Sequence, residues 1–241
     1  MVHSRTKVPV SDAELAAMVR RGFGAGTRVA SRVELTDGSY NAAYQVRLEH
    51  GPELVLKVAP PPDLKLLTHE VDLMRTEVDF YQRALGAGVP VPAVAFADLS
   101  RILLGRDYVF LELLATTPLS AAWDHMSTSD SAAVRHQIGA AVARLHAVTG
   151  EAYGYPLRGS DTWCPTWREA FMTMLDDILA DATRLDTELP EPPAAIAARL
   201  GRHADALDAV QRPALVHFDL WDGNIFVRPG ADGWRATSPP R

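Results

Sequence analysis

The sequence predicts an α+β protein with two lobes, because strand-like segments dominate its first half and helical segments its second half. Up to about residue 113, short apolar runs alternate with turn residues. After residue 114, apolar residues recur at helical spacing over three long stretches. With 241 residues, of which 47% are hydrophobic and 22% charged, the chain has the composition of a globular protein with a sizeable core.

The first lobe is predicted to begin with a helix over residues 12–21, because Ser11 and Glu14 form a capping box there. The glycine-rich segment GFGAG that follows is interpreted as the end of this helix, since a phosphate-binding loop would follow a strand. The other elements expected in this lobe are strands at residues 28–35, 42–49 and 53–59, a helix at 68–85, and strands at 91–96 and 107–113.

The second lobe is expected to consist of helices and a small hairpin. The expected helices cover residues 131–148, 165–185 and 193–210, and short strands are expected at 214–218, 224–229 and 233–237. The change of pattern near residues 114–118 divides the chain into lobes of residues 1–115 and 116–241.

Charge and cysteine content limit the classes of function. The formal net charge of −6 disfavours nucleic-acid binding, which usually requires a basic face, and it is compatible with a cationic small substrate. The lone Cys164 excludes an internal disulfide and suits a reducing compartment. The N-terminal segment MVHSRTKVPVSD lacks a signal-peptide core, and no apolar run is long enough to span a membrane. We expect a cytoplasmic protein without a membrane partner, whereas the oligomeric state is not indicated.

The segment LVHFDLWDGNIFV, residues 215–227, carries the most specific chemical pattern. His217, Asp219 and Asn224 form the sequence H-x-D-x-x-x-x-N between two apolar runs. An aspartate in this pattern can accept the proton of an attacking hydroxyl, and the asparagine can bind Mg²⁺ through its amide oxygen. A surface loop that contains Asp and Asn by chance is the alternative, but the complete pattern favours phosphoryl transfer.

Lys57 lies in the middle of the apolar run LVLKV, where burial of an ammonium group is costly unless it meets a negative charge. ATP phosphates would supply that charge; a lysine on an edge strand that points to solvent is the alternative. Kinase-like folds pair such a lysine with a glutamate of the next helix. We favour Glu77 over Glu70, because Glu70 lies in the first helical turn, where it would complement the helix dipole.

Two further segments are candidates for nucleotide contacts. The turn that contains Gly38, Ser39 and Asn41 joins the first two predicted strands, and its N–H groups could cover phosphates, although an ordinary hairpin turn is the alternative. The run YVFLELL lies at the lobe boundary, where backbone groups from Glu112 to Leu114 would hydrogen-bond an adenine ring.

Taken together, these segments resemble the aminoglycoside phosphotransferase superfamily, whose members are small-molecule kinases similar to protein kinases in fold. The matching pieces are VLK, TEVDFYQRALGAGVPVP, YVFLELL, ARLHAVTGEAYGY and LVHFDLWDGNIFV, in the family's order over roughly residues 28–237. The resemblance implies a protein-kinase-like two-lobe fold, with nucleotide binding in residues 1–115 and the catalytic loop in a helical lobe, 116–241.

The resemblance also implies the chemistry. Asp219 would be the catalytic base, Asn224 a magnesium ligand, Lys57 the phosphate clamp and His217 a structural support of the loop. The cofactors would be ATP and Mg²⁺, and the acceptor a hydroxyl of a small molecule. Family members act on aminoglycosides, macrolides, choline, homoserine or sugars, so a role in antibiotic resistance is one expectation.

The chain departs from the family pattern after the last predicted strand. A second magnesium-binding aspartate is expected there, but the sequence reads Ser238-Pro239-Pro240-Arg241, and Asp232 lies in the hairpin turn instead. We therefore expect an incomplete helical lobe, from truncation or a frame shift, and weak or absent catalysis, because metal-assisted charge neutralisation is central to phosphoryl transfer. An inactive, nucleotide-binding remnant is the alternative to an active enzyme.

An acidic helix provides a rival hypothesis. Asp176, Asp177 and Asp181 resemble an aspartate-rich metal motif of isoprenoid enzymes, and Asp177 and Asp181 share one helix face. No second acidic motif accompanies them in the sequence, so a solvated helix face is favoured over a metal site. Attraction of a cationic substrate is a weaker alternative.

Overall fold

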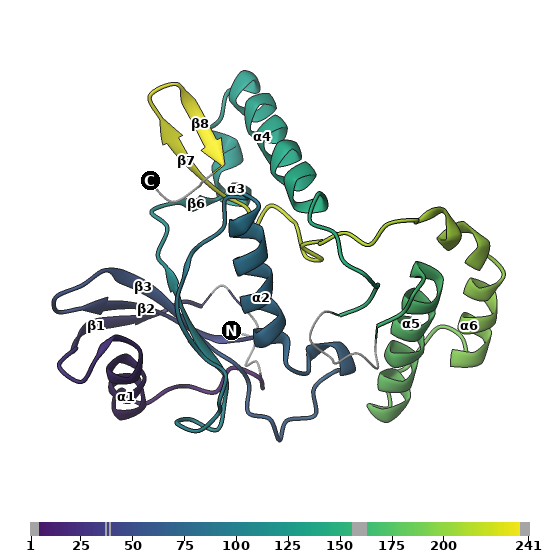
Figure 1. Cartoon of the computed structure of the whole chain (residues 1–241), viewed down its shortest axis with the longest axis horizontal. Helices are drawn as coiled ribbons and strands as arrows, with labels where there is room; N and C mark the ends of the chain where they lie inside the picture. Colours follow the sequence, from purple (N-terminus) through teal and green to yellow (C-terminus); the bar gives the residue numbers. More distant parts are fainter. Residues whose placement is uncertain (1–4, 37, 39, 156–162, 237–241) are drawn as a thin grey trace. The chain divides into compact units, whose positions relative to one another are not determined.

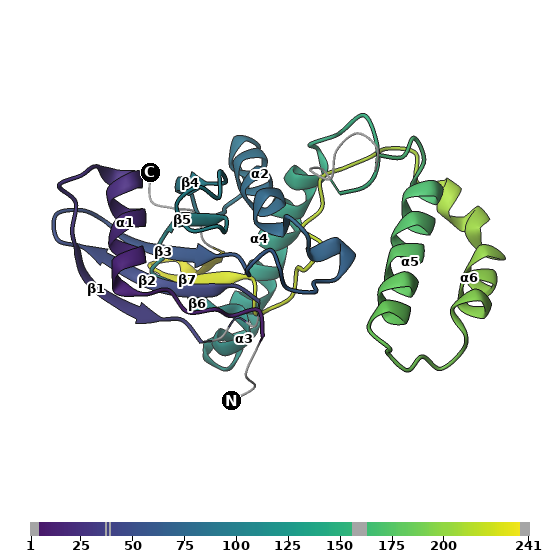
Figure 2. The same ribbon diagram turned by 90° about the horizontal axis from the view of Figure 1, so that it is seen from below.

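The computed structural model describes residues 5–36, 38, 40–155 and 163–236, and the chain divides into two compact units. The first unit contains residues 1–64, 77–148 and 216–241, and the second contains residues 65–76 and 149–215. Figures 1 and 2 show the elements of each unit. The combination of an antiparallel sheet with helices confirms the predicted α+β class. The functional division into lobes at residues 115 and 116 stays a prediction.

A five-stranded sheet with the order β1-β2-β3-β5-β4 forms the centre of the first unit, and all its neighbouring strands are antiparallel. Its strands are β1 (Val29–Glu34), β2 (Ala42–Leu48), β3 (Glu53–Val58), β4 (Val94–Asp98) and β5 (Tyr108–Glu112). The short turns after β1 and β2 produce the meander that the sequence predicts. In the register of the sheet, Lys57 of β3 lies between Ala43 of β2 and Val109 of β5.

The main core of the first unit lies between this sheet and α1 (Asp12–Phe23), which crosses the strands in Figure 2. The predicted capping box is present, because Ser11 and Glu14 exchange hydrogen bonds at the start of α1. Leu54, Leu56 and Val58 of β3 are buried in this core. Because side chains alternate along a strand, Lys57 points to the opposite face of the sheet.

Helix α2 (Leu73–Gly86) begins later than the predicted helix at residues 68–85. Thr68–Glu70 form a short 3₁₀ turn instead, and Asp72 has a φ angle of 58°. A left-handed residue cannot continue a right-handed helix, so α2 starts after it. The later start leaves Glu77 inside the helix, on its second turn.

The remaining elements of the first unit surround a second, smaller core. They are β6 (Thr117–Pro118), α3 (Leu119–Ala122), a 3₁₀ turn (Trp123–His125), α4 (Thr128–His146), β7 (Phe226–Gly230) and β8 (Gly233–Ala236). The strands form a sheet in the order β6-β7-β8, and α4 lies beside β8 in Figure 1. Leu119, Val134 and Val227 are fully buried where α3, α4 and β7 meet.

The strand predicted at residues 214–218 is wrong. Ala214 makes only an isolated bridge to Thr149, and Phe218 has a φ angle of 69°, which is incompatible with an extended strand. The segment is therefore a loop that leads into β7. The β6 strand, at residues 117–118, is a short element that the apolar pattern of the sequence does not indicate.

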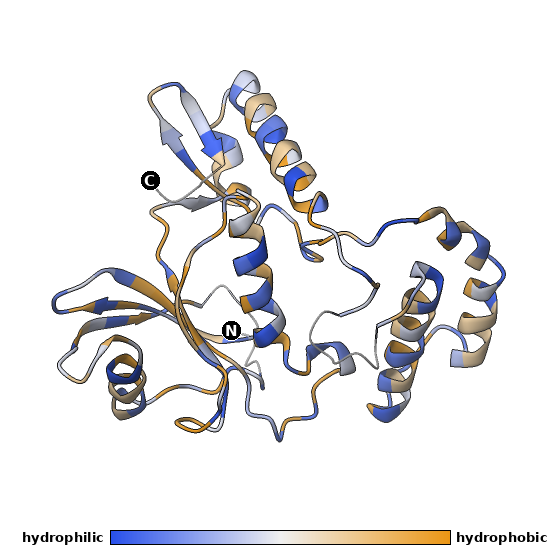
Figure 3. Cartoon of the chain, in the orientation of Figure 1, coloured by the Kyte–Doolittle hydropathy of each residue, from blue (hydrophilic) through white to orange (hydrophobic). Residues whose placement is uncertain are grey.

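The second unit is built on α5 (Trp167–Arg184) and α6 (Pro193–Gly201). The helix predicted at 193–210 ends at Gly201, and a 3₁₀ helix at Ala204–Ala209 follows it. Arg168 of α5 holds this 3₁₀ helix through ion pairs with Asp205 and Asp208. None of the helices in the described part of the chain is both long and apolar enough to cross a membrane. In Figure 3, apolar residues concentrate on the inner strands of the five-stranded sheet, whereas the β7–β8 hairpin is largely polar.

Gln137 fastens the hairpin to α4 through both ends of its side-chain amide. Its Nε2 donates to the carbonyl oxygen of Trp234 at 3.3 Å, and its Oε1 accepts from the N–H of Ala236 at 3.0 Å. Both bonds satisfy backbone groups of β8, which is an edge strand of its sheet.

We expect Gln137→Ala to lower the free energy of unfolding by about 1–2 kcal/mol, because two partly buried backbone groups lose their partner. Urea denaturation followed by circular dichroism measures this change. His136→Ala, at an exposed neighbour on the same helix, is the matched control and should change stability by less than about 0.5 kcal/mol. Equal effects of the two substitutions would contradict the role of the amide.

Candidate functional site

An ion pair joins Lys57 of β3 to Glu77 of α2 on the face of the sheet opposite α1. The Lys57 ammonium contacts Oε1 of Glu77, and the two side chains are 24% and 20% exposed. Glu70, the alternative partner, instead accepts the backbone N–H of Leu67 at 2.8 Å and caps the 3₁₀ turn. An ammonium group has three donors, so one carboxylate oxygen leaves donors available for a further anion.

Tyr81 is a second partner of Glu77, one helical turn further along α2. Its hydroxyl donates to the same Oε1 at 3.0 Å. Burial raises the pKa of Tyr81 well above its usual value, and the adjacent Glu77 carboxylate raises it further, so the hydroxyl stays a donor. Sequence reasoning missed this residue, although the i, i+4 spacing of Glu77 and Tyr81 on a predicted helix was the available signal.

The loop before β7 brings Asp219 and Asn224 together. The Asn224 Nδ2 donates to the carbonyl oxygen of Asp219 at 2.9 Å and to its Oδ2 at 2.7 Å. The Asn224 N–H also donates to the Trp221 carbonyl at 2.8 Å, which closes the turn between them. Because the amide nitrogen faces Asp219, the Asn224 Oδ1 is left as an oxygen donor for a cation, and both side chains are exposed.

Contacts with α3 and the turn after it fix this loop in place. The Trp123 Nε1 donates to Asp222 Oδ2 at 2.6 Å. The Ser120 N–H donates to the Asp222 carbonyl at 3.0 Å, and the Leu119 N–H to that of Ile225 at 2.8 Å. Nothing in the sequence pattern indicates these contacts, because they join residues about a hundred positions apart.

His217 lies between the two halves of the site. Its ring packs edge-on against Phe80 of α2, with ring centroids 5.3 Å apart. Burial lowers the pKa of His217, while the carboxylates of Asp219 and Glu77 and a hydrogen bond with the Asp219 backbone oppose that shift. Phe80 lies between Glu77 and Tyr81 in α2, so this contact brings the start of the Asp219 loop against the helix that carries Glu77.

The predicted nucleotide-contacting residues have mixed environments. Gly38 is exposed, and Ser39 lies outside the described residues. The Asn41 Oδ1 is buried without a hydrogen-bond partner among the described residues. Asn41 precedes β2 by one residue, close to Ala43, which pairs with Lys57 in the sheet.

At the predicted adenine position, only part of the backbone is free. The Glu112 N–H donates to the Ala93 carbonyl at 2.9 Å, so it is already used to hold the segment before β4. The Leu114 carbonyl accepts the Thr116 hydroxyl at 3.3 Å, whereas the Leu114 N–H has no partner among the residues that the structure describes.

The acidic helix does not form a metal site in the described residues. Asp181 is buried and accepts the Thr68 hydroxyl at 2.9 Å, and Arg184 pairs with it at 2.6 Å. Desolvation raises its pKa, but these bonds outweigh it and hold the pKa below its usual value. The Asp181 carboxylate therefore anchors the 3₁₀ turn at Thr68–Glu70 to α5, and it is not available to attract a substrate.

In residues 5–36, 38, 40–155 and 163–236, no group of three or more His, Cys, Asp and Glu side chains is arranged to hold a metal ion. Asp232, at the hairpin turn, forms an ion pair with Arg235 at 3.0 Å. Residues 237–241, where the sequence departs from the family pattern, lie outside the described residues. Asp219 and Asn224 are thus the two adjacent oxygen donors that the site offers.

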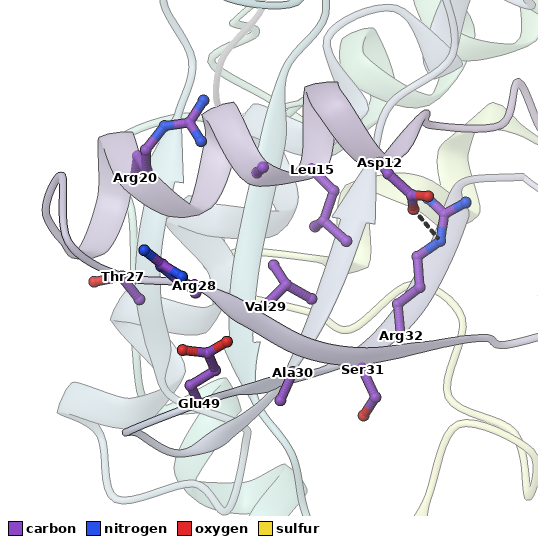
Figure 4. A pocket seen from close by; sticks show the side chains of 11 residues that line it. Asp12, Leu15, Arg20, Thr27, Arg28, Val29, Ala30, Ser31, Arg32 and Glu49 are labelled. Carbon is purple, nitrogen blue, oxygen red and sulfur yellow. Dashed lines mark ion pairs between the residues drawn. The ribbon is translucent and has the colours of Figure 1, made fainter.

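A separate pocket of about 430 Å³ lies between α1 and β1. Figure 4 shows Leu15 and Val29 near its centre and the ion pair of Asp12 with Arg32 at one end. Neither Lys57 nor Asp219 lines it. The side chains that line this pocket include neither a lysine–glutamate pair nor an aspartate–asparagine pair. The site around His217 is therefore the better candidate.

Phe218, between His217 and Asp219, adopts a left-handed backbone conformation with φ of 69°. This conformation costs a residue with a Cβ atom about 1–2 kcal/mol relative to glycine. The Phe218 side chain is 73% exposed, so packing recovers little of that cost. The strain is located beside the exposed carboxylate of Asp219, which is common at functional sites.

We expect Phe218→Gly to be more stable than Phe218→Ala by about 1 kcal/mol, because both remove the phenyl ring and only glycine relieves the strain. Chemical denaturation of the two variants gives the difference directly. An alanine variant as stable as the glycine variant would show that the left-handed conformation is not adopted in solution.

The lowered pKa of His217 predicts a pH-dependent stability. The folded state favours the neutral ring, so the unfolded state binds the proton more tightly, and the stabilisation is present above about pH 6.5 and lost as the pH falls through the folded-state pKa. His217→Asn should therefore lose less stability than the wild type between pH 7 and about pH 5. His136→Asn, at an exposed position, controls for loss of an imidazole; parallel curves for His217→Asn and the wild type would refute the prediction.

Comparison with known proteins gives the chain a family. The sequence profile described as the phosphotransferase enzyme family, APH, matches residues 31–237. No protein with a curated description matches the chain in sequence.

Two solved structures are similar over 95% of this chain. One, from Thermobifida fusca YX-ER1, is assigned provisionally as a fructosamine-3-kinase, is 26% identical and has a TM-score of 0.59. The other, from Ralstonia eutropha JMP134, is assigned provisionally as an aminoglycoside phosphotransferase, is 16% identical and has a TM-score of 0.60. The chain spans 74% of the first protein. It spans 64% of the second protein, which is less than two thirds of that protein's length. These likenesses confirm the predicted kinase-like fold, and the profile match shows that the chain belongs to the phosphotransferase enzyme family.

Proposed function

We propose that the protein transfers the γ-phosphoryl group of ATP to a hydroxyl of a small molecule. The observation that carries this proposal is the contact of His217 with Phe80, which joins the loop of the Asp219–Asn224 pair to the helix of the Lys57–Glu77 pair. The Lys57 ammonium can bind phosphates, and the Asp219 carboxylate, which is bonded to the Asn224 amide, can accept a proton. Phosphoryl transfer requires groups of both kinds. Membership of the phosphotransferase family supports the same assignment.

In this proposal, Lys57 binds phosphate oxygens of ATP through the donors that Glu77 leaves free. The Glu77 carboxylate holds the ammonium, which would otherwise move on a flexible side chain. Since phosphoryl transfer depends mainly on positioning and charge stabilisation, this fixed ammonium is the principal contribution of the sheet.

Asp219 acts as the general base. The hydroxyl oxygen of the acceptor attacks the γ-phosphorus, its proton passes to Asp219, and the bond from phosphorus to the β–γ bridging oxygen breaks to release ADP. The Asn224 amide binds Asp219 Oδ2, which fixes the carboxylate and leaves Oδ1 for the acceptor hydroxyl. The exposure of Asp219 suits contact with a substrate that arrives from solvent.

Among the described residues, Asn224 offers an amide oxygen to a magnesium ion. Asn224 Oδ1 would hold it together with phosphate oxygens and water, as Mg²⁺ prefers few protein ligands. The bound ion would neutralise charge on the phosphates. The Asn41 Oδ1 and the Leu114 N–H, which have no hydrogen-bond partner among the described residues, are further groups that support a nucleotide site in the proposed lobe of residues 1–115.

We propose a polyhydroxylated, amine-bearing acceptor, such as an aminoglycoside or a sugar amine. The names of both solved relatives refer to substrates of this kind. A net charge of −6 favours a cationic acceptor, and the rings of Phe218 and Trp221, which stand on either side of Asp219 in the sequence, are exposed and could pack against a sugar ring. A reaction that uses ATP, in a protein whose lone cysteine suits a reducing compartment, is consistent with the cytoplasm.

Ligand-dependent stability tests the proposal. ATP at about 100 times its Kd should raise the free energy of unfolding by roughly 2.7 kcal/mol, and Mg²⁺ should increase the effect. Asp219→Asn should keep this shift but lower ADP formation with aminoglycoside and sugar-amine acceptors by about a hundredfold or more, because the base is lost. Asp232→Asn, in the hairpin turn, is the matched control and should retain activity.

The outcomes separate the candidate functions. An ATP shift without a magnesium effect or turnover would favour a nucleotide-binding protein over an enzyme. If the wild type shows no ATP-dependent shift in stability and forms no ADP, the proposed function is overturned.

A further inference from the structure

The environment of Glu77 contains one group that the reaction scheme above does not use, the Tyr81 hydroxyl. It donates to Glu77 Oε1 at 3.0 Å, and Lys57 contacts the same oxygen. Glu77 and Tyr81 both belong to α2, so their hydrogen bond joins two side chains of one helix. It holds the Glu77 carboxylate on the side of α2 that faces β3. A charge-assisted bond of this kind is stronger than one between neutral groups.

Both side chains of the Lys57–Glu77 ion pair are flexible, so a further contact is needed to hold the Glu77 carboxylate in one orientation. Glutamate and lysine each lose considerable rotamer entropy when they are held in one geometry. Tyrosine carries its hydroxyl oxygen on a rigid ring, so only two side-chain torsions decide where this oxygen lies. Fixing Glu77 with Tyr81 therefore reduces the number of orientations open to the Lys57 ammonium.

The Tyr81 ring is itself held by aromatic contacts. It lies edge-on to Phe80, with ring centroids 6.1 Å apart, and Phe80 contacts His217. One turn of α2 thus contributes Glu77 to the ion pair with β3, Phe80 to the contact with His217, and Tyr81 to the hydrogen bond with Glu77 and the contact with Phe80.

We infer that Tyr81 is a positioning residue for phosphate binding, which acts by orienting Glu77 and through it the Lys57 ammonium. This inference rests on the proposed function, since it concerns the ATP phosphates. Tyr81 touches neither phosphate nor acceptor in this role, and its effect reaches the ligand only through Lys57. The inference therefore predicts a defect limited to ligands that carry phosphates.

Calorimetric titration of Tyr81→Phe with ATP and Mg²⁺, and separately with adenosine, tests the role. The loss of one hydrogen bond should weaken ATP binding roughly three- to tenfold and leave adenosine binding unchanged. Tyr44→Phe is the matched control, because the Tyr44 hydroxyl accepts the Val10 N–H at 3.0 Å in the core beside α1. It should lower stability without changing the ratio of the two affinities.

A double-mutant cycle with Lys57→Met makes the test specific for the route through Lys57. If Tyr81 acts through the ammonium, Tyr81→Phe should have no further effect on ATP binding in the Lys57→Met background. Additive losses, or equal losses for ATP and adenosine, would overturn the positioning role while the wild type still binds ATP. Failure of the wild type to bind ATP would overturn the proposed function itself, so the two failures are distinguishable.

Discussion

Placing one lysine in the middle of an apolar strand constrains the rest of the first unit. Alternation along β3 directs Leu54, Leu56 and Val58 into the core under α1, so the Lys57 ammonium must lie on the other face of the sheet. A charge that is three-quarters buried needs a partner, and that partner must come from the element that covers this face. Helix α2 satisfies the requirement with Glu77, and its next turn supplies the contacts that reach the Asp219 loop.

The loop itself combines exposure with restraint. Asp219 and Asn224 are exposed, yet hydrogen bonds between them and anchors from Asp222 to Ser120 and Trp123 fix their geometry. The left-handed conformation of Phe218 is unfavourable in free energy, and these anchoring hydrogen bonds hold the segment in it. A rigid loop of this kind would suit the proposed chemistry, because no entropy would be lost in ordering it at each turnover.

Acidic residues have different roles in the two units, although the sequence presents them alike. Asp219 is exposed and bonded to one amide, which leaves a carboxylate oxygen for a ligand. Asp181 is buried and saturated by Thr68 and Arg184, so its charge is used to hold a 3₁₀ turn on α5. Burial and hydrogen bonding, rather than the number of acids in a motif, decide which carboxylates remain free for chemistry.

The sequence by itself predicted the five strands of the large sheet, most helices and the residues proposed for the site, because alternation, capping and the H-x-D-x-x-x-x-N spacing are local properties. It also favoured Glu77 over Glu70 from helix position alone. The late start of α2 and the loop at residues 214–218 depended on left-handed residues, Asp72 and Phe218, which short-range patterns do not reveal. Tyr81, Asp222 and the buried state of Asp181 were decided only by tertiary structure, because contacts between residues distant in sequence fix which groups are covered and which partners they meet.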